Sequence, residues 1–299
     1  MSAIRPIHHT FAPLADRRFC AQALRLLFQP WTWKRGNAIQ ELRNALRSHF
    51  NADTFLFASG REGLYALLHA LGIAHGDEVI VQAYTCVVVP NAIAGTGATP
   101  VFVDIEKETL SLDPVEVRKM ITPKTKAVIC QHTFGIPAPL EELRAICDEH
   151  RIPLIEDCAH VIPSSSPEGE RIEGEDCAHV IPSSSPEGER IEGEDCAHVI
   201  PSSSPEGERI EGEDCAHMIA DEAGPAGVGM TGDFVMLSFG RDKAISGVTG
   251  GAILSRRTDV SNRLQKAEDA ASDLSLIAIK RFLLYPLIYA IARPFYGLV

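Results

Sequence analysis

The sequence predicts an α/β protein of three layers, in which helices cover both faces of a mostly parallel sheet. Short apolar segments alternate with helical patterns from residue 53 to residue 157, and this rhythm is typical of βαβ units. The apolar segments are also nearly continuous, which indicates strands buried on both faces, as in a parallel sheet. Together the two observations define the predicted fold class.

The predicted elements follow one another in a regular order, beginning with an amphipathic helix that runs from after Gly36 to about Phe50. Strands are expected at TFLFAS (54–59), EVIVQ (78–82), PVFVDI (100–105), AVICQ (127–131), IPLIED (152–157), DFVMLSF (233–239) and GGAILS (250–255). Further helices are expected at 60–72, 87–97, 113–121, 139–150 and 262–274. Asp113 and Pro114 fit the N-cap and the first position of the helix at 113–121.

The C-terminal tail differs from the rest of the chain. Residues 274–299 are apolar on many faces, but Lys280, Arg281 and Pro286 interrupt any run long enough to span a bilayer. We expect a helix that packs in a second domain or against a partner, and membrane contact is the less favoured alternative. The expected division is a large domain at 1–255 and the start of a truncated small C-terminal domain at 256–299.

A 19-residue segment, EDCAHVIPSSSPEGERIEG, fills 156–174 and is repeated letter for letter from Glu175 and from Glu194. A fourth copy begins at Glu213 and ends after EDCAH, so the repeated region spans about 156–219. Each copy holds five acidic residues and one Arg, and three copies therefore account for the whole net charge of −12. The neutral remainder gives no reason to expect a nucleic-acid partner.

Each copy carries an Asp, a Cys and a His within five residues, so the repeats are a candidate metal-binding array. Two observations count against it. There is no CxxC pair, and the polar stretch PSSSPEGERIEG has little to bury and is typical of a flexible loop. Identity even at polar positions indicates recent tandem duplication or an assembly error. We therefore expect no bound metal.

Cys130 ends an apolar run, so we expect a buried free thiol there. The N-terminus shows no secretory segment, and we expect a cytoplasmic protein.

Two candidate reactive residues follow strands, where parallel sheets collect their ligands. Lys243 lies beyond the strand at 233–239, and a desolvated Lys there can attack a carbonyl. Glycines at 240, 247, 250 and 251 permit close approach of a ligand. Asp157 ends the strand at 152–157, and a carboxylate there can pair with a protonated pyridine nitrogen. A solvated loop Lys and a helix-capping Asp are the alternatives.

Five further residues complete the candidate site. His160 follows Asp157 and can hydrogen-bond a cofactor oxygen, although a lone His near a loop is often an ordinary polar residue. Ser59-Gly60-Arg61 lies between a strand and a helix, where backbone N–H groups bind phosphate. Ser238 offers a hydroxyl to the same anion.

Five blocks of sequence occur in a fixed order: SGREGLYALLHALGIAHGDEVIVQAYT, NAIAGTGATPVFVDIEKETLSLDP, TKAVICQHTFGIP, IPLIEDCAH, and GDFVMLSFGRDK with GGAIL. They resemble the DegT/DnrJ/EryC1/StrS family of sugar aminotransferases over most of residues 36–255. The resemblance implies the large domain of a fold-type I pyridoxal-phosphate enzyme. It also implies a homodimer that aminates a nucleotide-linked keto sugar, with glutamate as amino donor, in polysaccharide or secondary-metabolite biosynthesis.

The resemblance assigns roles to the candidate residues. It implies that Lys243 holds pyridoxal phosphate as a Schiff base, that Asp157 faces the pyridine nitrogen and that His160 faces the ring oxygen. Gly60, Arg61 and Ser238, with the adjacent Ser59, would hold the phosphate. Cys86 stands where many relatives have an aromatic residue, and Tyr84 is the replacement we expect to stack on the ring.

The repeats leave two candidate copies for the site. Asp157 keeps the apolar strand before it, whereas Asp214 and His217 keep the shorter spacing to Lys243 that is typical of the family. A sheet position needs the strand, while a loop can lengthen at small entropic cost, so Asp157 and His160 are favoured. Besides an active aminotransferase, a catalytically impaired or regulatory homologue and a repeat-based metal or interaction protein remain as alternatives.

Overall fold

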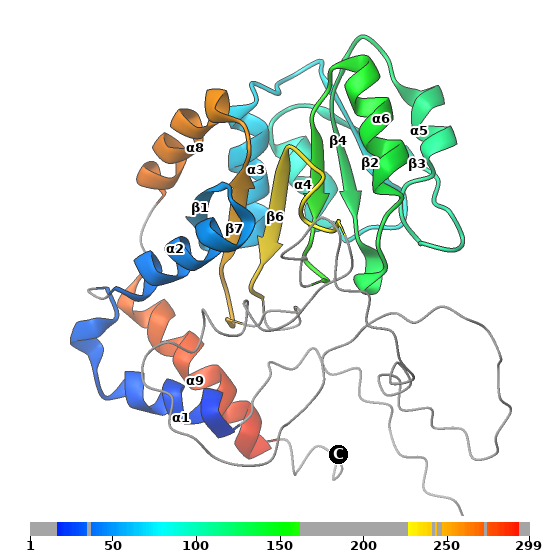
Figure 1. Ribbon diagram of the computed structural model, residues 1–299. Coiled ribbons are helices and arrows are strands. Elements are labelled where there is room, and N and C mark those ends of the chain that lie inside the picture. The colour runs from blue at the N-terminus through cyan, green and yellow to red at the C-terminus, as the bar shows by residue number, and fades with distance from the viewer. Residues whose placement is uncertain are drawn as a thin grey trace, which may run out of the picture.

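The computed structural model describes residues 17–34, 37–161, 227–240, 243, 247–271 and 274–292. Its strands are β1 (Asp53–Phe57), β2 (Glu78–Gln82), β3 (Thr99–Val103), β4 (Thr125–Gln131), β5 (Leu154–Asp157), β6 (Phe234–Ser238) and β7 (Gly251–Ser255). Each of them overlaps a strand predicted from the sequence. They form one 7-stranded sheet in the order β1-β7-β6-β5-β4-β2-β3, which Figure 1 shows.

The sheet is mostly parallel, as predicted. Among the described strands, β7 runs antiparallel to its neighbours, β1 and β6, while β2, β3, β4, β5 and β6 pair in parallel. The order places β5 in the middle of the sheet, so the carboxyl end of β5 has a parallel strand on either side. Ligand sites in parallel sheets form at this edge.

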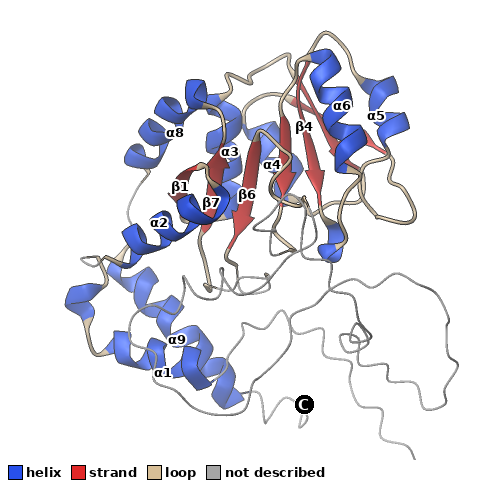
Figure 2. Ribbon diagram, viewed as in Figure 1, coloured by secondary structure: helices blue, strands red, loops and turns tan. Residues whose placement is uncertain are grey.

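Helices cover both faces of the sheet, which confirms the three-layer prediction (Figure 2). One layer contains α2 (Ala38–Phe50), α5 (Pro114–Met120) and α6 (Leu140–His150), and the other contains α3 (Gly60–Ala70), α4 (Val88–Gly95) and α8 (Thr258–Ala270). Leu46 of α2 and Leu143 of α6 belong to one buried apolar cluster. Leu67 of α3 and Leu264 of α8 belong to the other, so the sheet separates two cores.

The predicted start of α5 is confirmed in atomic detail. Asp113 has an extended backbone, and its carboxylate accepts hydrogen bonds from the N–H groups of Val115 and Glu116. Pro114 occupies the first turn, where a missing N–H costs nothing. Sequence signals that act within four residues were therefore sufficient to locate this helix.

A pair of helices from the two ends of the chain packs together. They are α1 (Arg17–Leu27) and α9 (Leu276–Ala292), and the Sγ of Cys20 lies 3.8 Å from the carbonyl oxygen of Pro286. The sequence predicted a helix in the tail but not α1.

No helix among the described residues combines the length and apolarity needed to cross a membrane. A domain boundary at 255/256 stays a prediction; α8, which follows it, packs on α3 and β1.

Candidate active site

The carboxyl ends of β5 and β6 bring together the reactive residues that the sequence singled out. Asp157 is the last residue of β5 and pairs with Met236 of β6. His160 follows three residues later, and Lys243 lies five residues beyond Ser238, the end of β6. The Nζ of Lys243 lies 3.2 Å from the Nε2 of His160, although 83 residues separate them in sequence. An amine and an imidazole therefore meet above the centre of the sheet.

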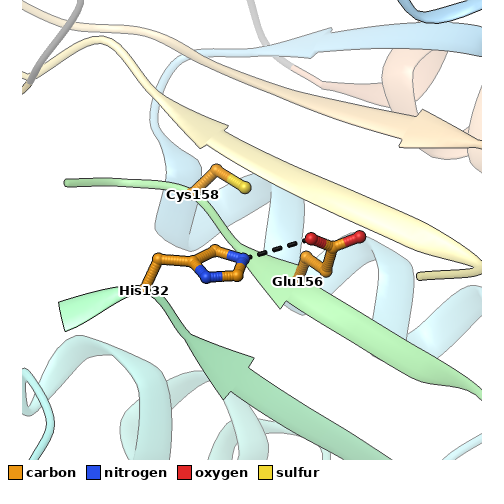
Figure 3. A group of neighbouring side chains, drawn as sticks. All are labelled: His132, Glu156 and Cys158. Atoms are coloured by element: carbon orange, nitrogen blue, oxygen red, sulfur yellow. Dashed lines mark hydrogen bonds and ion pairs between the residues drawn. The ribbon is translucent and has the colours of Figure 1, made fainter. Parts of the chain in front are cut away.

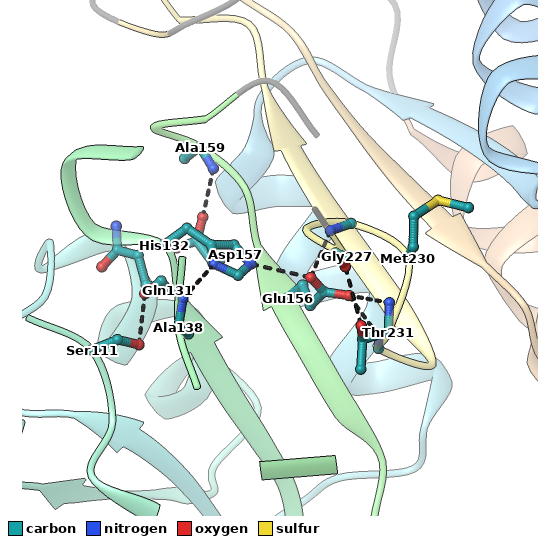
Figure 4. Close-up of polar contacts among 12 residues, drawn as sticks. Ser111, Gln131, His132, Ala138, Glu156, Asp157, Ala159, Gly227, Met230 and Thr231 are labelled. Carbon is teal, nitrogen blue, oxygen red and sulfur yellow. Dashed lines mark hydrogen bonds and ion pairs between the residues drawn. The ribbon is translucent and has the colours of Figure 1, made fainter. Parts of the chain in front are cut away.

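Asp157 is buried in this site. Its side chain is 1% exposed, and its Oδ1 accepts a hydrogen bond from the N–H of Ala159 at 3.0 Å (Figure 4). Burial raises the pKa of Asp157 to about 6, although the Ala159 hydrogen bond and the charge of Lys243 act in the opposite direction. A carboxylate in this position gains stability from any positive charge placed against it.

The predicted phosphate-binding residues meet at the start of α3. Ser59 is the N-cap, and its hydroxyl accepts a hydrogen bond from the N–H of Glu62 at 3.2 Å. A Cβ added to Gly60 would lie 3.1 Å from the Cβ of Ser238 and 2.9 Å from the Sδ of Met236, so glycine permits this approach. Arg61, the next residue, is exposed. The helix N-terminus thus lies beside the end of β6.

One glycine has a different role from the one predicted. The glycines around Lys243, at 240, 247, 250 and 251, were predicted to permit close approach of a ligand. A Cβ on Gly251 would instead lie 2.3 Å from the backbone nitrogen of Gly60. Gly251 therefore lets β7 pack directly against the first residue of α3, which fixes the helix terminus relative to the sheet.

Aromatic side chains line the same edge of the sheet. Tyr84 follows β2 and is 50% exposed, and Phe134 follows β4 and is 58% exposed. Their ring centroids are 6.2 Å apart, and the Phe134 ring stacks on the His160 ring at 6.1 Å with an interplanar angle of 6°. Tyr84 was predicted to belong to the site. Phe134 was not, although it lies in the QHTFGIP block that carried the resemblance.

Beneath this edge lies a buried group that could hold a metal ion, formed by His132, Glu156 and Cys158. Figure 3 shows their side chains pointing toward one another. The Nε2 of His132 lies 3.1 Å from Glu156 Oε2, while His132 Nδ1 accepts from the N–H of Ala138 at 3.0 Å. This assigns the ring proton to Nε2, which donates to Glu156. Both ring nitrogens are thereby used, which argues against a metal ion here.

Glu156 connects β5 to the loop that precedes β6. Its carboxylate also accepts hydrogen bonds from the N–H groups of Gly229, Thr231 and Gly232. Burial opposes ionisation, yet the hydrogen bonds from His132 and the loop prevail, and the pKa of Glu156 is lowered. We call the segment 227–232, held by Glu156, the anchor loop (Figure 4).

The anchor loop bears on which repeat copy enters the fold. It follows the whole repeated region in sequence, yet it bonds to Glu156, which is the first residue of the first copy. Asp157 of the same copy lies in the sheet. The alternative residues, Asp214 and His217, lie outside the described residues, as do the cysteines of the later copies.

Three buried thiols are protected from reaction, whereas the thiol of Cys86 is exposed. Cys130, predicted to be buried, is 0% exposed, and Cys147 and Cys158 are buried as well. Burial raises the pKa of Cys147 to about 12 and the pKa values of the other two well above the usual range. Since the thiolate is the reactive form, these cysteines serve as apolar packing groups.

Comparison with protein families finds one matching model. Residues 15–179 match the DegT/DnrJ/EryC1/StrS aminotransferase family. A GDP-perosamine synthase of Escherichia coli O157:H7 is 39% identical over 136 residues, covering 45% of this chain and 37% of that enzyme. An L-glutamine:2-deoxy-scyllo-inosose aminotransferase of Micromonospora echinospora is 45% identical over 102 residues, covering 34% of this chain and 24% of that enzyme. The chain thus matches well under half the length of these curated relatives.

The fold is also similar to that of solved aminotransferases. The structure of NtdA from Bacillus subtilis, described with bound cofactor PMP, superposes with a TM-score of 0.59 at 17% identity. The match covers 93% of this chain and 55% of that one. At this level of identity the likeness supports the fold.

Proposed function

The chain belongs to the DegT/DnrJ/EryC1/StrS aminotransferase family, and from this we propose that it is a pyridoxal-phosphate-dependent aminotransferase acting on a nucleotide-linked keto sugar. The observation that carries the proposal is the meeting of Lys243, His160 and Asp157 at the carboxyl ends of β5 and β6. An amine, an imidazole and a buried carboxylate are the groups that this chemistry requires.

The residues present fit the cofactor. Asp157 is buried with a pKa raised to about 6, and a protonated pyridine nitrogen beside it would supply the missing positive charge. The N-terminus of α3 at Gly60, with Ser59 and Ser238 close by, offers N–H groups and hydroxyls to a phosphate. We propose Arg61 as a further contact of that phosphate, and Tyr84 as a ring that stacks on the pyridine.

The proposed chemistry divides between the cofactor and the protein. When bound, the pyridine ring supplies an electron sink for a carbanion. Lys243 would hold the cofactor through its Nζ amine, with release of water, and the same amine, when free, would accept the α-proton of the amino donor. His160 orients the Nζ of Lys243 and the ring oxygen, and Asp157 keeps the ring nitrogen protonated.

The substrates, assembly and location are proposed on the basis of the relatives. GDP-perosamine synthase is named for a nucleotide-linked sugar, and we assign this chain the same substrate class. Glutamate is the proposed amino donor, and L-glutamine, which the inosose aminotransferase carries in its name, is the donor to compare with it. A homodimer and a cytoplasmic location stay predictions; the free thiols fit a reducing compartment.

Absorbance of the purified chain with pyridoxal phosphate tests the function. Wild type is expected to develop the visible band of a lysine-bound cofactor, and Lys243→Ala is expected to lack it. Lys266→Ala is the matched control, since Lys266 is an exposed lysine of α8, and it should keep the band. The proposal fails if wild type shows no band, or if Lys243→Ala retains it. Turnover is then measured by conversion of glutamate or glutamine with a panel of nucleotide-linked keto sugars.

A further inference from the structure

A buried carboxamide joins three loops beneath the exposed aromatic rings of the site. Gln82 is the last residue of β2 and is 0% exposed. Its Nε2 lies 2.9 Å from the carbonyl oxygen of Tyr84 and 3.2 Å from that of Leu110. The same nitrogen donates to the Thr133 hydroxyl at 2.8 Å. These partners lie in the loops that follow β2, β3 and β4, so one side chain connects all three.

The neighbours of Gln82 also fix which way its amide points. Its Oε1 accepts from the N–H of Gln131 at 3.1 Å and from the Ser111 hydroxyl at 3.3 Å. Backbone carbonyls can only accept and a backbone N–H can only donate, so the nitrogen must face Tyr84 and Leu110. A carboxylate in this position would face two carbonyl oxygens, and a hydrocarbon would leave them unpaired. The site therefore requires an amide.

One of these loops holds a residue in an unfavourable backbone conformation. Phe134 has φ 55° and ψ 21°, a left-handed conformation that a bulky residue adopts only where its surroundings impose it. Its two preceding neighbours are both held: Thr133 bonds to Gln82, and His132 bonds to Glu156 and Ala138. The hydrogen bonds on this segment hold the Phe134 ring parallel to His160.

We propose that Gln82 is a positioning residue that holds Tyr84 and Phe134 at the mouth of the site, where their exposed rings meet a flat aromatic ligand bound beside His160. The proposal rests on the proposed function, because the flat ligand is the pyridine ring of the cofactor. Gln82 itself touches no ligand and acts through the two loops. Losing the positioning of both rings is expected to weaken ligand binding about tenfold, the equivalent of one to two aromatic contacts.

Binding of pyridoxamine phosphate tests the proposal, because this amine form cannot bond covalently to Lys243 and so reports on the surrounding contacts alone. Gln82→Met keeps the length of the side chain without its hydrogen bonds and is expected to bind about tenfold more weakly. Thr125→Val is the matched control: Thr125 is a buried hydroxyl of β4 that accepts from the N–H of Thr122 at the opposite end of the strand. It should be less stable but bind as wild type does.

Gln82→Glu adds a readout that general destabilisation would not produce. Ionised, its carboxylate repels the carbonyls of Tyr84 and Leu110; protonated, it can donate to one of them. Binding by this variant is therefore expected to be weak at pH 8 and to recover as the pH falls toward 6, measured relative to wild type at each pH. Equal binding by Gln82→Met and wild type, or a defect in Gln82→Glu that does not change with pH, would overturn the proposal.

Amide hydrogen exchange separates this proposal from the proposed function. In the chain without cofactor, Gln82→Met is expected to speed exchange at 83–86 and 132–136 and to leave 125–129 unchanged. This result is independent of any ligand. If wild type binds no cofactor, the proposed function fails while faster exchange still supports the role of Gln82. Unchanged exchange in both segments contradicts the positioning role whether or not cofactor binds.

Discussion

The buried negative charge of Asp157 destabilises the folded chain at neutral pH, and a protonated cofactor nitrogen beside it would offset this effect. Its pKa is about 6 in the folded chain against 3.8 in its ordinary state, so the folded protein holds its proton more tightly than the unfolded one. Protonation of Asp157 therefore stabilises the folded chain. This contribution to the free energy of unfolding is fully present below pH 4 and is lost as the pH rises through 6. A shift of this size corresponds to about 3 kcal/mol at most.

Replacing Asp157 should therefore stabilise the chain when no cofactor is bound. Asp157→Asn keeps an oxygen for the N–H of Ala159 and carries no charge, so its free energy of unfolding should exceed that of wild type by more at pH 7.5 than at pH 5. Urea unfolding at the two pH values measures the difference. The same variant should bind pyridoxal phosphate more weakly, since it cannot balance a protonated ring nitrogen.

Asp214→Asn is the matched control, because the repeat places an identical Glu-Asp-Cys-Ala-His sequence around it. It should change neither the pH dependence of stability nor cofactor binding. The opposite pattern, with Asp214→Asn losing the cofactor and Asp157→Asn keeping it, would assign the site to the fourth copy.

At the level of single residues, the sequence indicated the candidate reactive residues more readily than the residues that hold the surrounding loops in place. Asp157 ends a strand and Lys243 and His160 follow strands, and these positions are readable from the chain alone. Gln82 and Glu156 are polar residues that end or interrupt apolar runs, but their partners lie 51 and 76 residues away at the furthest. Such pairings depend on which strands become neighbours in the sheet, and the local patterns of a single sequence do not reveal that order.

At the scale of elements, Glu156 and Arg256 hold the anchor loop from two sides. Glu156 accepts from three of its N–H groups, and Arg256 donates to the carbonyl oxygens of Gly229 and Gly232. β5, β6 and β7 are thereby joined through a loop of six residues.

Glu156→Gln should loosen this junction. The substitution places an NH₂ group against N–H donors, so buried donors lose their acceptor, and we expect a loss of about 3 kcal/mol in the free energy of unfolding. Urea unfolding measures it. Glu149→Gln is the control, because Glu149 pairs with Arg118 on the surface, where solvent screens the pair, and it should leave the free energy of unfolding nearly unchanged. A similar small loss for both variants would contradict the role of Glu156.

The secondary structure was largely predictable, for a local reason. Continuous apolar runs marked the strands, and Asp113 with Pro114 marked a helix start. The helix α1 was missed although its sequence, RRFCAQALRLL, is amphipathic, and its packing partner, α9, lies at the other end of the chain. The reversed direction of β7 was also unreadable, since direction depends on the path of the chain between strands.

At the scale of the whole molecule, the repeats after the first copy lie in sequence between Glu156 and the anchor loop, which are hydrogen-bonded to each other. The described structure stops at Val161 and resumes at Gly227, and Glu156 bonds to the residues after the gap. Deleting residues 161–217, which joins His160 to Met218, removes 57 residues, three copies of the repeat. The fold should persist, because every contact of the anchor loop described here remains.

The deletion should also stabilise the chain. A shorter connection has less entropy to lose on folding, and each halving is worth about 0.6 kcal/mol, so the gain is about 2 kcal/mol. Deleting 161–179 alone, a single copy, should yield only a few tenths of a kcal/mol. Urea unfolding ranks the stabilities of wild type and the two deletion variants, and the visible band of the bound cofactor shows whether each of them has a working site. A cofactor band that appears only after the deletion would favour an enzyme impaired by its repeats.

The anchor loop also has a consequence for how the gene can change. Because Glu156 bonds to the anchor loop on the other side of the repeated region, these hydrogen bonds can form whatever the number of nineteen-codon units between them, and each unit changes stability by only about a few tenths of a kcal/mol. Gains and losses of whole units by replication slippage would be close to neutral, whereas a shift of reading frame would not. Changes of length by whole repeat units are therefore a kind of variation that the fold of the sheet can tolerate.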